Sequence, residues 1–322
     1  MITATGLTKR YGSTAAVDGL TFEVQPGIVT GFLGPNGAGK TTTMRLILGL
    51  DSATDGSVTV NGQSYRDKAA PMQEVGALID PSAVHGGRSA YNHLLWQAQA
   101  GGIRRSRVDE VLDMAGLAGV ARKKVGGFSL GMHQRLGIAS ALLGDPPVLL
   151  FDEPVNGLDP EGIQWIRALM KRFAAEGRTV FVSSHLMSEM EQTANHVLVI
   201  GRGRLIADVS VEEITRRSAL SHVKVVSQRA HELSGHLEAH GASVSNGTPH
   251  ELTVTGLDAG AIGAIAFQHG IPLDELSPRR ASLEDAFMEL TRDSVEFRAG
   301  SRPSDPATDV AEIARELAGK AN

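Results

Sequence analysis

The segment GPNGAGKT at residues 34–41 constrains the fold of this chain more than any other part of the sequence. It fits the spacing G-x-x-x-x-G-K-[ST], and it lies between a predicted strand over 28–33 and a predicted helix over 40–48. Its glycines let successive backbone N–H groups face a phosphate, and the start of the following helix adds partial positive charge. The segment therefore predicts a strand, a phosphate-binding loop and a helix, which together form a unit of an α/β fold.

The residues of this phosphate loop suit the contacts that a nucleoside triphosphate requires. Lys40 can reach the β- and γ-phosphates with its ammonium group, and the hydroxyl of Thr41 can ligate Mg²⁺. The other positions offer backbone N–H groups and close approach, with a plain glycine turn as the alternative interpretation. The nucleotide-binding residues expected in the loop are Gly34, Pro35, Asn36, Gly37, Ala38, Gly39, Lys40, Thr41 and Thr42.

A second segment, VLLFDEP at 148–154, places two carboxylates directly after four apolar residues. A buried strand that ends in Asp-Glu suits a nucleotide hydrolase, because one carboxylate can hold Mg²⁺ while the other acts on water. Asp152 is expected to contact the metal ion, and Glu153 to polarise the attacking water as a general base. Acidic strand ends are common, so this segment becomes a strong indication only beside the phosphate loop.

The composition favours a cytoplasmic protein that does not bind nucleic acid. The 322 residues carry a net charge of −5 and include no cysteine, which excludes disulfides and thiolate metal sites. An acidic chain lacks the clustered Lys and Arg that grip a phosphate backbone. The N-terminus has no apolar signal segment, and the apolar runs fall far short of the roughly 18 residues of a membrane span. Any membrane crossing is therefore expected from another chain.

The apolar pattern of residues 1–218 continues the alternation of strands and helices. Short β-rich runs predict buried strands, and apolar residues at helical spacing predict helices that face a core. The fold class predicted for this domain is α/β, with a mixed or parallel sheet. Further strands are expected over 148–151, 179–182 and 197–200, and helices over 105–115 and 161–176.

After about residue 218 the order of elements becomes β-α-β-β-α-β, which predicts a small α+β accessory domain over 219–292. Its last helix begins at SLEDAF, where Ser282 and Asp285 have the spacing of a capping box. Residues 293–322 read as a linker and a short amphipathic run, interpreted as a frayed tail or, alternatively, as a docking segment. Within the domain, strands are predicted over 223–226, 242–244, 252–255 and 273–276, and helices over 231–240 and 259–269.

Together these segments resemble the nucleotide-binding subunit of an ABC transporter of the bacterial drug and antibiotic resistance exporter type. Residues 1 to about 215 carry the family motifs in the family order, and SLEDAFMELT at 282–291 resembles the C-terminal extension of such exporters. Under this resemblance GPNGAGKT is the Walker A motif, VLLFDEP the Walker B motif, and FSLGMHQR at 128–135 the signature motif. Tyr11 matches the aromatic residue on which adenine stacks, and His185 matches the switch histidine.

The resemblance implies ATP hydrolysis with Mg²⁺ in a dimer of identical or homologous subunits. ATP on the Walker A motif of one subunit would be covered by Ser129 and Gly131 in the signature of the other. The segment NGLD matches the D-loop, so Asn156 and Asp159 are expected to contact the partner subunit. A helical insert over about 82–125 would pass the motion to a separate membrane permease, with the chain peripheral on the cytoplasmic face. The catalytic residues implied are Lys40, Glu153 and His185.

Three positions depart from the family pattern. Leu130 and Met132 stand where the signature has a glycine and a glutamine. Ser129 remains a natural N-cap of the helix that follows, so its hydroxyl and the neighbouring amides can face a phosphate. The segment is interpreted as altered but competent, with a broken site as the alternative. Asp80 stands where the family has a glutamine near the γ-phosphate, and it is either a Mg²⁺ contact or an ordinary loop residue.

Two other functions remain open beside the ATPase subunit of an exporter. One is a soluble ABC ATPase that acts on ribosomes or DNA, although this chain has a single cassette and neither a basic stripe nor heptad repeats. The other is a weakly active regulatory subunit paired with an active homologue, which Leu130 and Met132 of the altered signature and Asp80 keep open.

Overall fold

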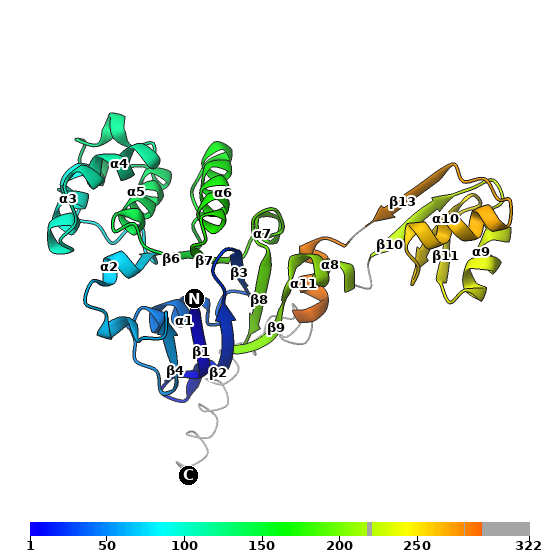
Figure 1. Cartoon of the computed structure of the whole chain (residues 1–322), viewed down its shortest axis with the longest axis horizontal. Coiled ribbons are helices and arrows are strands. Elements are labelled where there is room, and N and C mark those ends of the chain that lie inside the picture. Colours follow the sequence, from blue (N-terminus) through cyan, green and yellow to red (C-terminus); the bar gives the residue numbers. More distant parts are fainter. Residues whose placement is uncertain (218–220, 280, 292–322) are drawn as a thin grey trace, which may run out of the picture.

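The computed structural model describes residues 1–217, 221–279 and 281–291 of the chain. Figure 1 shows the strands β10–β13 with their two helices at one end of the molecule and the helices α3–α5 at the other. Among the described residues, no helix is long and apolar enough to cross a membrane. The expected linker and tail over 293–322 lie outside the described residues.

A six-stranded sheet forms the centre of the first lobe, and it is parallel except for its last strand. The strands β3, β6 and β7 are buried along their whole length, as expected for parallel strands covered on both faces. The strands expected in this part of the chain are confirmed to within two residues at each end. In spatial order they are β5 (Val75–Leu78), β6 (Val148–Asp152), β7 (Thr179–Ser184), β3 (Val29–Leu33), β8 (His196–Gly201) and β9 (Arg204–Ser210).

A second sheet of three antiparallel strands packs on the first and has no counterpart among the sequence-based expectations. Register shifts interrupt the pairing of its two long strands, and Gly6 and Gly19 have positive φ, so a regular alternation is absent from the sequence. Phe22 of this sheet lies 6.1 Å from Phe32 and 6.0 Å from Phe181 of the first, measured between ring centroids. Its strands, in spatial order, are β2 (Thr14–Val24), β1 (Ile2–Tyr11) and β4 (Asp55–Val60).

Helices cover the parallel strands on both faces. The helix α1 (Lys40–Ile47) follows β3 and buries Met44, while α6 (Pro160–Ala175) buries Ile166 and Phe173 against the sheet. Both helices confirm the sequence-based expectation. Two short helices, α2 (Pro71–Glu74) and α7 (Met187–Thr193), also belong to this lobe.

Three further helices form a separate group beside the sheet (Figure 1): α3 (Ala90–Ala100), α4 (Ser106–Met114) and α5 (Leu130–Leu142). Leu94, Val111 and Leu136, one from each helix, are buried in a common core. The helix α5 packs so closely on β5 that a Cβ atom at Gly76 would lie 1.9 Å from the Ala141 carbonyl oxygen. Only glycine permits this approach, which fixes the position of the helical group on the sheet.

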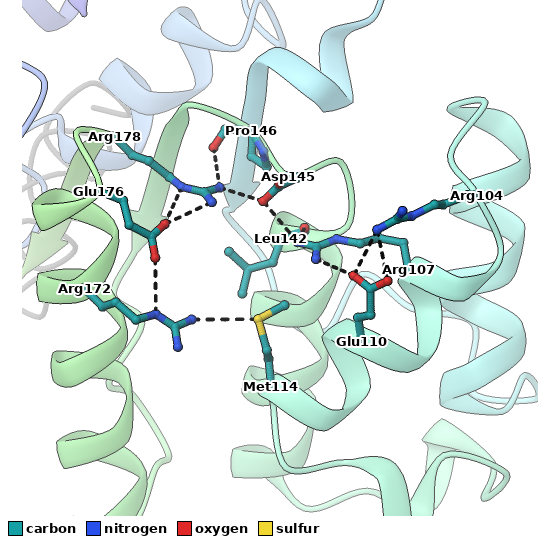
Figure 2. Close-up of polar contacts among 10 residues, drawn as sticks. All are labelled: Arg104, Arg107, Glu110, Met114, Leu142, Asp145, Pro146, Arg172, Glu176 and Arg178. Carbon is teal, nitrogen blue, oxygen red and sulfur yellow. Dashed lines mark hydrogen bonds and ion pairs between the residues drawn. The ribbon is translucent and has the colours of Figure 1, made fainter.

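A chain of ion pairs also joins the helical group to the sheet lobe (Figure 2). Asp145 lies at its centre, 3.2 Å from Arg107 of α4 and 2.9 Å from Arg178 beside β7. The two arginines continue the chain at its ends, Arg107 to Glu110 at 2.8 Å and Arg178 to Glu176 at 3.1 Å. Each guanidinium in this network therefore has a carboxylate partner, and the network serves to hold two parts of the chain together.

The accessory domain is a four-stranded antiparallel sheet with two helices, in the expected chain order β-α-β-β-α-β. Its core gathers Val225, Leu233, Val254 and Ile262 from four different elements. The strand expected over 273–276 begins two residues later than predicted. In spatial order the strands are β11 (Ser243–Thr248), β12 (Glu251–Thr255), β10 (His222–Val226) and β13 (Glu275–Arg279), with helices α9 (Ala230–Ala239) and α10 (Ala259–Gln268).

The last described helix, α11 (Leu283–Thr291), packs against α7 and α8 (Val211–Arg217) of the first lobe. Its side chains Leu283 and Phe287 belong to the core of that lobe, together with Ile214 of α8. This differs from the expectation of one accessory unit over 219–292, because the chain returns to the first lobe before its last helix. The apolar face of α11 alone could not reveal which of the two cores it covers.

Polar contacts fix the start of α11. The capping box is confirmed, since the Asp285 N–H donates to Ser282 Oγ at 3.1 Å and the Ser282 N–H donates to Asp285 Oδ2 at 3.1 Å. The Leu283 N–H donates to Glu191 Oε2 of α7 at 3.3 Å. The helix is therefore tied to α7, which begins two residues after His185.

We expect Phe287→Ala to release α11 from the first lobe. Phe287 is 7% exposed, and truncating a buried phenylalanine costs about 3 kcal/mol, so amide exchange in α11 should rise about hundredfold. The neighbouring Met288 is 59% exposed, and Met288→Ala is the matched control that should leave exchange unchanged. Hydrogen–deuterium exchange measured by mass spectrometry gives this readout. Equal exchange in both variants would contradict this packing.

Candidate active site

The phosphate loop is held in shape by close backbone contacts between β3 and α1. A Cβ atom at Gly39, which has φ 104°, would lie 2.4 Å from the Ala16 carbonyl oxygen. At Gly34 it would lie 2.6 Å from the carbonyl oxygen of Ile200. The loop therefore requires glycine at both positions, for the left-handed backbone at Gly39 and for close approach at Gly34.

Lys40 is folded back into this loop. Its Nζ donates to the Gly34 carbonyl at 2.7 Å and lies 3.4 Å from the Pro35 carbonyl oxygen. The side chain is 7% exposed, and its nearest carboxylate is Glu153, with Oε1 3.9 Å from Nζ. The ammonium group is thus positioned at the mouth of the loop, where a phosphate would replace the carbonyl contacts.

Burial lowers the pKa of Lys40 below its usual value of 10.5, although the nearby carboxylates of Glu153 and Asp152 act in the opposite direction. Between the lowered pKa and 10.5 the unfolded chain binds more protons than the folded chain. The contribution of Lys40 to the free energy of unfolding therefore rises as pH rises through that window. Below the window the buried charge is a cost to the folded state.

The same pKa shift predicts a pH dependence of ATP binding. We expect the affinity to fall as pH rises through the lowered pKa of Lys40, because a neutral amine loses its charge-assisted contact with phosphate. The dissociation constant can be followed by calorimetry from about pH 7 to about pH 10, with Lys40→Arg as the control whose charge does not titrate. A wild-type profile as flat as that of the arginine variant would contradict the assignment.

A carboxylate and two hydroxyl groups meet where β6 and β7 end. Thr41 Oγ1 donates to Asp152 Oδ2 at 2.7 Å, and the Ser183 hydroxyl makes a short hydrogen bond to Asp152 Oδ1. Asp152 and Ser183 are both buried. Mg²⁺ prefers oxygen ligands and is usually held by one or two carboxylates plus substrate phosphates, so the donor set of Thr41 and Asp152 fits this ion. Within the described residues, no group of three or more His, Asp or Glu side chains could bind a metal without a substrate.

Glu153 is the most constrained residue of the site. Its backbone is left-handed, with φ 50°, and the structure fixes it from both sides. The Glu153 N–H donates to Ser183 Oγ at 3.0 Å, and its carbonyl accepts from Gln134 Nε2 at 3.1 Å. The carboxylate oxygen Oε2 lies 2.7 Å from His185 Nδ1. The glutamate is therefore aimed by its backbone and paired with His185, the histidine that the family resemblance identifies as the switch histidine.

Ser183 and Gln134 are functional candidates that sequence reasoning does not identify. Ser183 stands two residues before His185, and Gln134 is the seventh residue of FSLGMHQR, so each lies close to a residue or motif that the family resemblance identifies. Their roles depend on contacts with Asp152 and Glu153 from distant parts of the chain. No spacing in the sequence signals such contacts.

The signature segment begins α5 and lies in the helical group, apart from the phosphate loop (Figure 1). Ser129 is confirmed as the N-cap, since its Oγ accepts from the Met132 N–H at 3.3 Å. Gly131 and Leu130 rest on the D-loop turn, where a Cβ at Gly157 would lie 2.4 Å from Leu130 side-chain atoms. In this single chain, no described contact joins Ser129 to the phosphate loop.

The two expected dimer-contact residues lie on the exposed turn between Glu153 and α6. Asn156 donates its backbone N–H to the Glu153 carbonyl at 3.2 Å, and its side chain is exposed. Asp159 is the N-cap of α6, with Oδ1 accepting from the Gly162 N–H at 2.9 Å. The turn therefore connects the general-base candidate to a rigid helix, and its contact with a partner subunit stays a prediction.

Tyr11 lies at the end of β1 with half of its surface available. Its hydroxyl donates to Asp51 Oδ2 at 3.0 Å, and Lys9 Nζ lies 5.0 Å from the ring centroid. The residue is 51% exposed, which leaves ring surface on which an adenine could stack. Asp51 also pairs with Arg45 of α1 at 2.8 Å. Asp51 therefore links Tyr11 to α1, the helix that follows the phosphate loop.

Asp80 is engaged locally. Its Oδ1 accepts from the N–H of Ser82 at 2.8 Å and from the Ser82 hydroxyl at 2.6 Å, and these bonds hold the pKa of Asp80 below its usual value. Within the described residues, no contact joins Asp80 to Thr41 or Asp152. The structure does not bring it into the oxygen cluster, and its role as a Mg²⁺ contact stays a prediction.

Comparisons with known proteins agree with this arrangement. A family model described as "ABC transporter" matches residues 17–156. The chain is 37% identical to the bacitracin transport ATP-binding protein BcrA of Bacillus licheniformis over 297 residues, which cover 90% of this chain and 97% of that protein. The chain belongs to the ABC transporter family. A second model, a domain of unknown function (DUF8746), matches residues 221–284 of this ABC protein.

Other relatives share the same extent and fold. The daunorubicin resistance ATP-binding protein DrrA3 of Streptomyces coeruleorubidus is 33% identical over 306 residues, covering 91% of this chain and 96% of that protein. A dimeric bacterial ABC transporter cassette superposes with a TM-score of 0.60 and 25% identity, covering 66% of this chain and 99% of that one. The α/β fold of the P-loop ATPase type is thereby confirmed, and the chain is an ATP-binding subunit that hydrolyses ATP.

Proposed function

We propose that this ABC subunit powers the export of antibiotics or related drugs through a separate membrane permease, on the cytoplasmic face of the membrane. The observation that carries the proposal is the match over nearly the whole chain, accessory domain included, to subunits named for bacitracin transport and daunorubicin resistance. The alignments reach past the ATP-binding part into the region of residues 221–284. No observation favours a soluble, non-transport ATPase.

The geometry supports specific roles for the residues of the site. Lys40 would bind the β- and γ-phosphates, while Thr41 and Asp152 would hold Mg²⁺, which would neutralise part of the phosphate charge. Glu153 accepts a proton from the attacking water as a general base, and His185 at 2.7 Å orients its carboxylate. The left-handed backbone of Glu153 keeps this carboxylate at the loop mouth before ATP arrives.

The site of one chain is incomplete without a second subunit. Ser129 and Leu130 at the start of α5 are exposed, and this thirteen-residue helix directs the positive end of its dipole toward that surface. A γ-phosphate held by Lys40 would then lie between the phosphate loop of one subunit and Ser129 of the other. ATP then joins two subunits, identical or homologous, and hydrolysis separates them.

A groove between the helical group and the sheet lobe is a suitable contact for the permease. It has a volume of about 350 Å³ and is mostly apolar, with Leu50, Met72, Trp96 and Ala141 among its lining residues. Leu50 and Trp96, which both line the groove, are 56% and 52% exposed, so they offer apolar surface to a partner. A cytoplasmic segment of the permease in this groove would touch both the helical group and the sheet lobe.

The proposal is tested by tagging the protein in its own cells, solubilising the membranes gently and identifying what copurifies in stoichiometric amount. We expect a polypeptide with about six membrane spans. Recovery only in the soluble fraction with ribosomal or DNA-bound partners would instead support a non-transport ATPase. Recovery with a second, more active ABC subunit would support the regulatory alternative.

A further inference from the structure

Ser183 is a fully buried polar residue on a face of the sheet that is otherwise apolar. It follows Phe181 by two positions in β7, so both side chains point to the same face. Phe181, Phe32 and Leu150 belong to one apolar cluster on that face. Burying a hydroxyl is unfavourable unless it is hydrogen-bonded, so the reason for a serine here lies in its hydrogen bonds rather than in its packing.

The register of the sheet places Ser183 beside Asp152. The strands β6 and β7 are parallel, and Asp152 and Ser183 are paired positions at their ends. Side chains at paired positions of neighbouring strands point to the same face of the sheet. The next residue along β6 is Glu153, whose backbone N–H turns toward Ser183. The end of β7 therefore contacts both acidic residues at the end of β6.

The Ser183 hydroxyl makes two hydrogen bonds with opposite roles. It donates its proton to Asp152 Oδ1, and its oxygen accepts from the Glu153 N–H at 3.0 Å. A serine hydroxyl has one proton and two acceptor lone pairs, so both bonds form at the same time. One buried side chain thus holds the carboxylate of Asp152 and the backbone of Glu153 in a fixed relation.

The bond to Oδ1 orients the carboxylate of Asp152. The other oxygen, Oδ2, lies 2.7 Å from Thr41 Oγ1 and therefore faces the phosphate loop. Carboxylates that ligate a metal ion are usually hydrogen-bonded themselves, and loss of such an outer partner typically costs about 10- to 100-fold in metal affinity or activity. Ser183 has the position of such an outer partner relative to Asp152.

The bond from the Glu153 N–H supports a backbone that needs support. Glu153 has φ 50°, and a residue other than glycine stays in this region only where its surroundings hold it there. Without the Ser183 hydroxyl, the described acceptor left to the Glu153 N–H is the Ser183 carbonyl at 3.3 Å. A catalytic group displaced by about 1 Å can lose about 100-fold in rate, so this bond matters for the aim of the carboxylate.

We propose that Ser183 is a positioning residue of ATP hydrolysis, whose hydroxyl sets the Asp152 carboxylate for the metal ion and the Glu153 backbone for the attacking water. This inference rests on the roles proposed above for Asp152 and Glu153. Ser183 acts through these two residues and contacts neither the nucleotide nor the water. Its removal should therefore weaken metal binding and turnover together, while the phosphate loop still binds ATP.

Ser183→Ala in the full-length chain tests the proposal. At saturating Mg²⁺, kcat should fall by about 10- to 100-fold with little change in the KM for ATP. Mn²⁺ accepts the same oxygen ligands as Mg²⁺, and its binding can be followed by electron paramagnetic resonance with a non-hydrolysable ATP analogue. Its affinity should fall by about tenfold or more. Ser183→Thr keeps the hydroxyl on a residue that strands favour, and it should restore most of both values.

Ser227→Ala is the matched control. Ser227 is also fully buried, and its hydroxyl donates to the Pro272 carbonyl at 2.7 Å and accepts from the Arg229 N–H at 3.1 Å. It lies in the accessory domain, outside the ATP site. This variant loses the same two kinds of hydrogen bond, so its thermal midpoint should fall while kcat and the Mn²⁺ affinity stay at the wild-type values.

A double-mutant cycle separates the two roles of Ser183. In a Glu153→Gln background at saturating Mg²⁺, adding Ser183→Ala should lower turnover by no more than about twofold, because the aim of a carboxylate no longer matters there. The Mn²⁺ affinity should still fall as far as it does in the single variant. A full further loss of turnover would show that Ser183 does not act through Glu153.

Two other results would overturn the proposal. The first is wild-type turnover and Mn²⁺ affinity in Ser183→Ala while Glu153→Gln is slow, which would leave the role of Glu153 intact. The second is an equal loss of kcat in Ser183→Ala and Ser227→Ala, which would reflect stability alone. Should Glu153→Gln itself turn over at the wild-type rate, the proposed general base fails, and the Mn²⁺ affinity still tests the contact with Asp152.

Discussion

Glu153→Gln should reduce ATP hydrolysis by about two to four orders of magnitude, the usual contribution of a general base. The amide keeps the size of the carboxylate but cannot take a proton from water. The backbone contacts from Ser183 and Gln134 that aim the side chain do not involve the carboxylate, so the local fold should remain. ATP affinity should be unchanged, because the residue reaches no phosphate in the proposed arrangement.

The measurement is the rate of phosphate release under saturating ATP, together with the dissociation constant of ATP. Glu238→Gln, which removes one exposed carboxylate from α9 of the accessory domain, is the control and should hydrolyse at the wild-type rate. Wild-type turnover by the Glu153 variant would remove this residue from the mechanism. Loss of ATP binding would instead place its carboxylate in nucleotide recognition.

Lys40→Ala should weaken ATP binding by about ten- to hundredfold, since a hydrogen bond to a charged group contributes about 1.5–3 kcal/mol. The buried ammonium at 7% exposure exchanges two backbone carbonyl contacts for phosphate oxygens, and alanine offers neither. Removing the buried cation should not unfold the loop, because the close contacts of Gly34 and Gly39 fix its backbone.

Calorimetric titration with ATP measures this effect, with Lys171→Ala on the exposed face of α6 as the control. The control should bind as the wild type does. An unchanged affinity in Lys40→Ala would mean that the loop binds phosphate through its backbone alone, and the pH dependence expected from Lys40 would then have to be absent as well.

Local patterns were sufficient to predict much of the fold. Glycine spacing predicts the loop between β3 and α1, and four apolar residues before Asp152 predict the buried strand β6. The N-cap role of Ser129 and the capping box at Ser282 follow from short-range hydrogen bonding, which depends only on neighbouring residues. These features are local, and a single sequence contains the information that determines them.

Contacts between distant segments could not be predicted in this way. The hydrogen bond from Thr41 to Asp152 joins residues 111 positions apart, and the Ser183 contact with the same carboxylate depends on the neighbouring strand β7. The return of α11 to the first lobe is equally invisible, because an apolar helical face packs on either core. The antiparallel sheet of β1, β2 and β4 lacks a clear sequence pattern for a different reason, since glycines and register shifts hide its alternation.

The most direct test of ATP-driven association is the molar mass of the Glu153→Gln subunit in solution. With saturating ATP and Mg²⁺, light scattering should give twice the 34.0 kDa of one chain, and with ADP it should give the mass of one chain. Adding Ser129→Arg should prevent the dimer without reducing ATP binding to each subunit. A mass of 34.0 kDa with one ATP bound per chain would contradict the shared site.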